Sequence, residues 1–144
     1  MLSFHLAIER EFARFADEFA VRGLPLQGRY KAHLLRQEST RLGSRAVALP
    51  ALAFQTAAHA AGAVYVVEGS TLGGLQIARS LEKHLQFTSR YYGCYGAQTA
   101  SRWREITGAL EMFPQGDAER EAMCDGAKMT FDALYEHLAG ARLG

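Results

Sequence analysis

The sequence of 144 residues is 49% hydrophobic and 22% charged, a composition typical of a single folded domain with its own core. Its formal net charge of +1 gives no electrostatic reason to expect nucleic acid or an anionic membrane surface as a partner. No apolar run is long enough to span a bilayer, and acidic residues near the start argue against a signal peptide, so we expect a cytoplasmic protein.

Apolar spacing predicts that the chain begins with one long helix. Five apolar residues recur at i, i+4, i+8, i+11 and i+15, which is one face of an α-helix: Phe4, Ile8, Phe12, Phe15 and Phe19. Gly23 and Pro25 are expected to end this helix.

A second helix is expected over residues 27–42, ended by Gly43 and followed by a loop over 44–50. Its inward side chains are expected to be Tyr30, Leu34 and Leu35. The long segment 51–85 follows and has a face of small residues: Ala57, Ala58, Ala60, Ala61, Gly62 and Ala63. Residues 63–67 form the one run with a period of two, but the run is short and its surroundings are helical.

The C-terminal part is also expected to be helical. Residues 88–96 are the least helical stretch, and its three tyrosines are expected to pack in the core and the loop: Tyr91, Tyr92 and Tyr95. A helix over 97–113 carries Trp103, Ile106 and Leu110 at helical spacing. After a turn at 114–116, Asp117 is a good N-cap for a last helix that ends near Leu138. The apolar stripe of this last helix is Met123, Ala127, Thr130, Phe131, Leu134 and Leu138. Together these elements predict one all-α, bundle-like domain over residues 1–144.

Cysteine usage is consistent with a reducing compartment. Cys94 and Cys124 lie far apart and outside any CxxC pattern. Free cysteines usually behave as small buried hydrophobes, and we expect this of both thiols.

The segment GSTLGG, residues 69–74, places three glycines inside an apolar helix, at a cost of about 1 kcal/mol each relative to alanine. One interpretation is helix packing, in which Gly69 and Gly73 let two backbones approach closely. A second is that a flat ligand lies against the uncovered backbone. A phosphate-binding loop is a third, but the run has no GK[ST] lysine and follows no strand.

Four stretches in chain order carry a family resemblance: HLAIERE (5–11), YVVEGSTLGG (65–74), RYYGCYG (90–96) and AKMTF (127–131). YVVEGSTLGG looks like the distal-helix motif of the haem oxygenases, particularly the bacterial group often found beside bacteriophytochromes. The resemblance covers nearly the whole chain. It implies a helical bundle of the haem oxygenase type, in which the distal helix bends at its glycines and packs its backbone across one face of haem.

The resemblance implies specific roles for residues of the distal helix. Gly69, Gly73 and Gly74 would be the distal contacts to haem. Ser70 stands where better-known members have an aspartate that orders distal water, and a hydroxyl there carries no charge. Glu68 is expected to be structural, with its carboxylate bonding N–H groups freed at the bend.

The opposite wall of the pocket departs from the family pattern. Met1 aligns with the family's second helix, so the chain is N-terminally short and the proximal histidine has no equivalent in this sequence. His59 is a candidate substitute for the iron ligand, although a structural role is the alternative. Lys128 matches a lysine that contacts a haem propionate, whereas Asp132, one turn later, would repel one.

The other four histidines are expected to have structural or solvent-exposed positions. His5 is expected in the core or at the surface, and not as a ligand. His33 and His84 are expected to be solvated. His137 is expected to act as a cation that the dipole favours near the end of the last helix.

By this resemblance the chain is expected to cleave haem to biliverdin, CO and iron, using O2 and electrons from an external reductase or ferredoxin. An alternative is a non-catalytic protein that binds haem or another tetrapyrrole, or a helical interaction module. Its open apolar groove would then be covered by self-association or by a partner helix. A plain helical scaffold is the third hypothesis, and it does not explain the length of the YVVEGSTLGG string.

Overall fold

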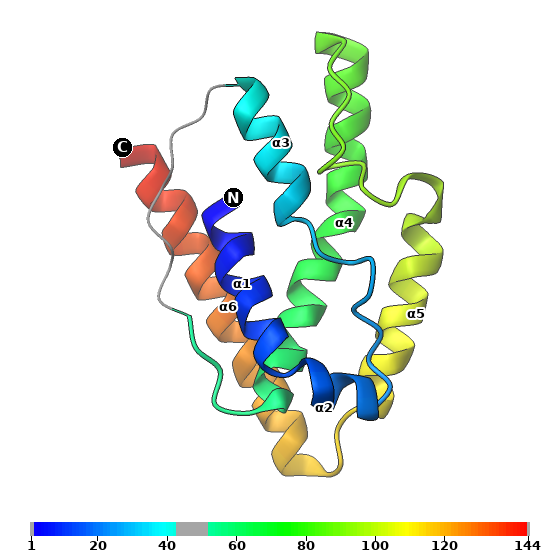
Figure 1. Cartoon of the computed structure of the whole chain (residues 1–144), viewed down its shortest axis with the longest axis vertical. Helices are drawn as coiled ribbons and strands as arrows, with labels where there is room; N and C mark the ends of the chain where they lie inside the picture. Colours follow the sequence, from blue (N-terminus) through cyan, green and yellow to red (C-terminus); the bar gives the residue numbers. More distant parts are fainter. Residues whose placement is uncertain (1, 43–51, 144) are drawn as a thin grey trace.

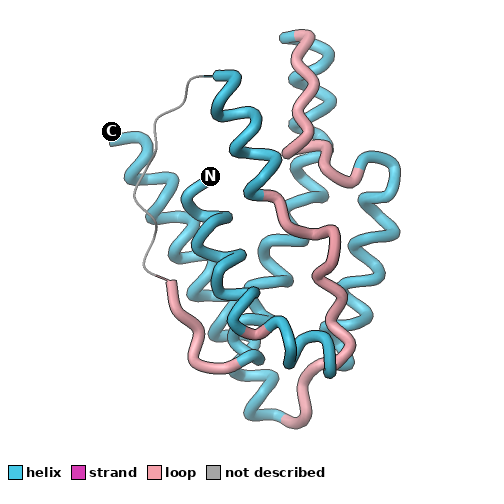
Figure 2. The backbone as a smooth tube through the Cα atoms, in the orientation of Figure 1, coloured by secondary structure: helices cyan, strands magenta, loops and turns pink. Residues whose placement is uncertain are grey.

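The structure is a computed structural model that describes residues 2–42 and 52–143. Over these residues it is all-helical, without strands, and folds as one bundle (Figures 1 and 2). The elements are α1 (Leu2–Arg14), α2 (Ala16–Val21), α3 (Ala32–Leu42), α4 (Ala57–Leu85), a 3-10 turn η1 (Gly96–Gln98), α5 (Thr99–Met112) and α6 (Asp117–Leu143). This confirms the expected all-α class. None of the described helices combines the length and the apolar character that a membrane crossing requires.

The predicted first helix is two helices, because the chain breaks at Phe15 between α1 and α2. The break lets α2 turn so that Phe19 packs edge-on against both Phe12 and Phe113. Four of the five predicted phenylalanine and isoleucine positions are buried, and Phe15 is partly buried. Gly23 adopts a positive φ of 77°, which glycine allows without strain.

The second helix starts later than predicted, at Ala32 instead of residue 27. Its start is fixed by α1, because the Glu9 carboxylate accepts hydrogen bonds from the backbone N–H groups of Lys31 and Ala32. The expectation that Tyr30 faces inward is wrong, since it precedes the helix and is 39% exposed. Leu35 is buried and Leu34 is half-buried. Gly43 and the loop expected at 44–50 lie outside the described residues.

The central helix α4 runs unbroken from Ala57 to Leu85, through the apparent strand at 63–67 and through all the glycines of GSTLGG. Thr56 caps its N-terminus by accepting a hydrogen bond from the backbone N–H of His59. Gln86 ends it in the left-handed conformation with φ 52°.

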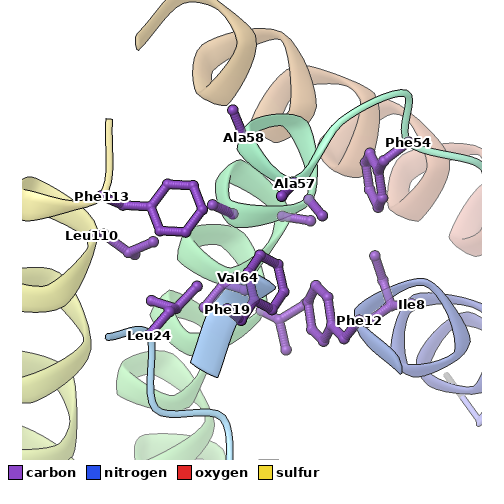
Figure 3. Packing of buried hydrophobic residues seen from close by; sticks show 14 of the residues in the cluster. Ile8, Phe12, Phe19, Leu24, Phe54, Ala57, Ala58, Val64, Leu110 and Phe113 are labelled. Carbon is purple, nitrogen blue, oxygen red and sulfur yellow. The ribbon is translucent and has the colours of Figure 1, made fainter. Parts of the chain in front are cut away.

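The core gathers around the lower half of α4. Figure 3 shows Phe12, Phe19 and Phe113 close to Val64, with Leu24 and Leu110 beside them. These side chains come from α1, α2, the loop after α2, α4 and the end of α5, so the core joins these segments around α4.

The closest helix contact is between α4 and α6, where two glycines face the partner's backbone. A methyl group on Gly62 would lie 1.9 Å from the carbonyl oxygen of Met123, and one on Gly126 would lie 1.8 Å from that of His59. The backbone contact proposed for Gly69 and Gly73 therefore occurs instead at Gly62 and Gly126.

Helix α6 begins with Asp117 in its first turn, one position inside the expected N-cap, and the Asp117 carboxylate accepts from the Arg120 side chain. The helix continues to Leu143, beyond the expected end at Leu138. Of its predicted inward stripe, Phe131 is 55% exposed and Leu138 is 46% exposed, so both positions were wrongly assigned to the core. Thr130 is fully buried, and Met123, Ala127 and Leu134 are half-buried.

Candidate functional site

The upper half of α4 carries a hollow that contains three of the four expected site residues. Ser70, Gly73 and Gly74 line it on the α4 side, and Lys31 and the loop residues Tyr91 and Tyr92 line it from across. The remaining lining residues are Thr71 and Ile77. The cavity measures about 200 Å³, and a second hollow of about 430 Å³ adjoins it at Ile77 and extends along α4 to Leu85.

The three glycines of GSTLGG have three different surroundings. A methyl group on Gly73 would meet no atom within 4 Å, so the backbone of α4 is open there. Gly74 lies against the loop, where a methyl group would be 3.0 Å from the carbonyl oxygen of Tyr92. Gly69 is covered by the ring of Trp103 and does not line the hollow. The open backbone expected of all three glycines is therefore found at Gly73.

The hydroxyls beside the hollow bond to their own helix. Ser70 Oγ donates to the carbonyl oxygen of Val67 at 2.6 Å, and Thr71 Oγ1 donates to that of Glu68 at 2.6 Å. Each hydroxyl has thus used its proton, and its oxygen can still accept a hydrogen bond from a ligand.

A buried ionic cluster lies behind the hollow and is centred on Glu68. Its carboxylate accepts from Arg29 Nη1 at 2.9 Å, from Lys31 Nζ at 3.0 Å and from Tyr95 Oη at 2.9 Å. Burial, and next the charge of Glu68, raise the pKa of Tyr95, so its hydroxyl stays protonated as a donor. Glu68 was expected to bond N–H groups freed at a bend, but the partners of its carboxylate are these three side chains.

The sequence did not predict the Glu68 cluster, because the two basic residues that bind Glu68 lie in an irregular segment. Arg29 and Lys31 precede α3 and alternate with the more exposed Tyr30, whereas both were assigned to a helix. Their side chains are 2% exposed. Tyr95 was assigned to packing alone, and no sequence pattern marks it as a partner of Glu68.

A second buried polar pair joins α1 to the loop. His5 Nε2 lies 2.8 Å from Tyr91 Oη, and the two rings pack edge-to-face with centroids 5.3 Å apart. Burial, with a smaller contribution from the Lys31 ammonium, lowers the pKa of His5 from 6.5 to about 3. The imidazole is therefore neutral near pH 7, and His5 lies in the core, which is one of the two positions expected of it.

This shift predicts a loss of stability in mild acid. The unfolded chain protonates His5 near pH 6.5 and the folded chain only near pH 3, so the stabilisation is complete above pH 6.5 and is lost as the pH falls toward 3. Between pH 7 and pH 5 we expect the free energy of unfolding to fall by about 2 kcal/mol through His5. Urea unfolding at the two pH values measures this, and His5→Gln should remove the effect while the exposed His33→Gln should keep it. An equal loss in wild type and His5→Gln would contradict the assignment.

The other expected site residues lie away from the hollow. His59 Nδ1 is 2.8 Å from Thr56 Oγ1 at the start of α4, about 16 Å along the helix from Ser70. Lys128 is exposed on α6 and does not line the hollow. Burial lowers the pKa of His137, and α6 continues beyond it, so the expected cationic helix end is wrong.

The exposure of two further histidines agrees with expectation, whereas that of the two cysteines agrees only in part. His33 and His84 are exposed as expected, and His84 borders the second hollow. Both cysteines are free, but Cys124 is exposed and not buried, whereas Cys94 is half-buried in the loop.

The α4 hollow has a surface that suits one face of a flat apolar ligand, but its volume is small for such a ligand. Gly73 leaves the backbone open and Ile77 adds apolar surface, but the hollow of about 200 Å³ is smaller than the usual ligand pocket of roughly 300–1,000 Å³. Of the five histidines, only His84 borders either hollow. Within residues 2–42 and 52–143, no three histidine, cysteine or acidic side chains are placed to bind a metal ion together.

Comparison with known proteins adds no identification, because no family model, curated protein or solved structure matches the chain.

Proposed function

We propose that this chain binds haem against the open face of α4 and acts as a haem oxygenase, producing biliverdin, CO and iron with O2 and electrons from an external reductase or ferredoxin. The observation that carries the proposal is the hollow at Ser70, Gly73 and Gly74, inside the string that resembles the family's distal helix. The uncovered backbone at Gly73 permits the close approach that a flat ring requires.

Two further lining residues have a role in this proposal. Ile77 gives apolar surface to the macrocycle, and the Ser70 oxygen can accept a hydrogen bond from a bound ligand. The haem itself supplies the redox chemistry, and the chain supplies orientation and the polar surroundings. A cytoplasmic location belongs to the same proposal, whereas Lys128 lies away from the hollow and is not proposed as a propionate contact.

A second candidate is a tetrapyrrole-binding protein without turnover. It is favoured by the hollow's lining, which contains no histidine, cysteine or methionine that could bind iron in the usual way. Exposed Phe131, Tyr135 and Leu138 on α6 offer apolar surface for a second copy or a partner helix, which could supply the ligand.

Hemin titration followed by reduction distinguishes the two candidates. Haem oxygenase activity predicts a Soret band typical of histidine ligation and, after adding reductase and O2, the absorbance of biliverdin. The binding protein predicts a Soret band that shifts on adding imidazole and no biliverdin at any imidazole concentration. His84→Ala, with His33→Ala as a matched exposed control, tests whether His84 contributes the ligand. Absence of any saturable hemin binding would contradict both candidates.

A further inference from the structure

The wall of the hollow opposite α4 is a non-helical loop. Residues 86–95 connect α4 to η1 through turns with isolated backbone bonds, such as that from the Gly93 N–H to the Ser89 carbonyl at 3.2 Å. Tyr91 and Tyr92 of this loop line the hollow. A loop of this kind needs side-chain anchors to hold one conformation, because its backbone supplies few bonds of its own.

Three helices each provide an anchor for this loop. From α1, His5 Nε2 lies 2.8 Å from Tyr91 Oη. From α3, Glu38 accepts from Ser89 Oγ at 3.0 Å and from the Tyr91 backbone N–H at 3.1 Å. The α4 anchor is Glu68, which accepts from Tyr95.

The geometry of the His5 anchor favours one arrangement of protons. If Tyr91 donates its hydroxyl hydrogen to Nε2, the neutral His5 imidazole carries its own hydrogen on Nδ1. The Nδ1–H group is then the one buried donor of His5 and Tyr91 that has no partner among the described residues. In the other tautomer Nε2–H donates to Tyr91, which leaves both the Tyr91 proton and the Nδ1 lone pair without one. On this ground we assign the tyrosine as the donor, and in either tautomer removal of its hydroxyl deletes the bond.

The position of the Tyr91 ring affects the hollow through the neighbouring residue, Tyr92. Tyr91 packs edge-on against Tyr92 with centroids 4.9 Å apart, and the Tyr92 carbonyl lies against Gly74 of α4. A shift of Tyr91 would therefore move Tyr92 relative to α4, and so change the width of the hollow.

We propose that His5 and Glu38 are positioning residues that hold the 86–95 loop as the second wall of the α4 hollow, and that Tyr92, which lines this wall, limits what fits there. The proposal deepens the proposed function and rests on it for the nature of the ligand. The loop's own anchoring is a separate property and can be measured without any ligand.

Cys94 reports on the loop directly. Its thiol is half-buried, and burial raises its pKa, so it reacts slowly while the loop stays closed. In a Cys124→Ser background it is the one remaining thiol, and its reaction with a disulfide reagent at pH 8 measures loop opening. We expect Tyr91→Phe, His5→Leu and Glu38→Ala each to speed the reaction about fivefold or more, because loss of one ordinary hydrogen bond changes the opening equilibrium by about that factor.

Controls separate positioning from general destabilisation. Glu119→Gln removes a comparable carboxylate, the partner of Arg22, far from the loop, and should leave the Cys94 rate unchanged. The double variant His5→Leu/Tyr91→Phe should react no faster than either single variant, because both delete the same bond. His5→Gln, which can still accept from Tyr91, should return the rate toward that of the parent.

A second set of measurements determines how tightly each variant binds hemin. Variants with a faster Cys94 rate should also bind hemin more weakly, and Tyr92→Ala should weaken hemin binding more than an anchor variant with the same Cys94 rate does. Cys94 rates within twofold of the parent in all three anchor variants would overturn the proposal. If those rates rise but the parent itself binds no hemin, the proposed function fails while the anchoring of the loop stands.

Discussion

Replacing Gly62 with alanine is expected to lower the free energy of unfolding by about 3 kcal/mol or more, because the added methyl group would meet backbone that cannot move independently. The methyl would lie 1.9 Å from the Met123 carbonyl oxygen and 2.8 Å from the Ala127 nitrogen. Relief requires α4 and α6 to separate, and these two helices form the most extensive helix pair in the bundle. Gly126→Ala should have an effect of similar size from the opposite side. Urea unfolding at pH 7 measures both.

The matched control is Gly73→Ala, on the same helix. A methyl group there meets nothing within 4 Å, so the substitution should stabilise the chain by roughly 0.5–1 kcal/mol through the better helix propensity of alanine. If Gly62→Ala were as harmless as Gly73→Ala, the observed crossing of α4 and α6 would be wrong.

The second large effect is expected at Glu68, whose removal would take from the buried Lys31 its carboxylate partner and leave the buried Arg29 with the exposed Glu105. Glu68→Gln keeps the shape of the side chain but not the charge that Arg29 and Lys31 share, and we expect it to cost about 3–5 kcal/mol. Chemical denaturation at pH 7 measures the loss. Tyr95→Phe should cost less, about 1–3 kcal/mol, because it removes one hydrogen bond and no charge.

Glu105→Gln is the matched control for Glu68→Gln. Glu105 contacts the same Arg29 at 3.2 Å, but its side chain is 56% exposed, so water screens its charge and the substitution should cost less than about 1 kcal/mol. Equal effects of the two substitutions would mean that burial does not set the strength of this cluster.

Helix periodicity predicted the element type well and the boundaries less well. The spacing of Phe4, Ile8 and Phe12 reports a buried helix face, and the structure confirms it. The break at Phe15 and the late start of α3 are tertiary effects: one lets Phe19 reach the core, and the other follows from Glu9 capping across helices. No local pattern in the sequence contains either contact.

The sequence indicated where on α4 the hollow lies, but not which residues form its second wall. The glycine string correctly indicated where the backbone of α4 is uncovered, although only Gly73 is open. The second wall depends on Tyr91 and on His5, which are 86 residues apart and meet only through folding. The same small-residue face that was noted around Gly62 marks the helix crossing, but its partner, Gly126, could not be recognised from the sequence of α6 alone.

The central claim is that haem lies against α4 at Gly73, and hemin titration of Gly73→Leu tests it most directly. The single tryptophan, Trp103, covers Gly69 one turn away, and hemin bound nearby would quench its fluorescence because haem absorbs where tryptophan emits. Gly108→Leu is the control, since Gly108 is also an exposed helical glycine with nothing within 4 Å. We predict that Gly73→Leu weakens hemin binding at least tenfold, about 1.4 kcal/mol, and that Gly108→Leu does not. Equal affinities for Gly73→Leu and wild type would contradict the claim.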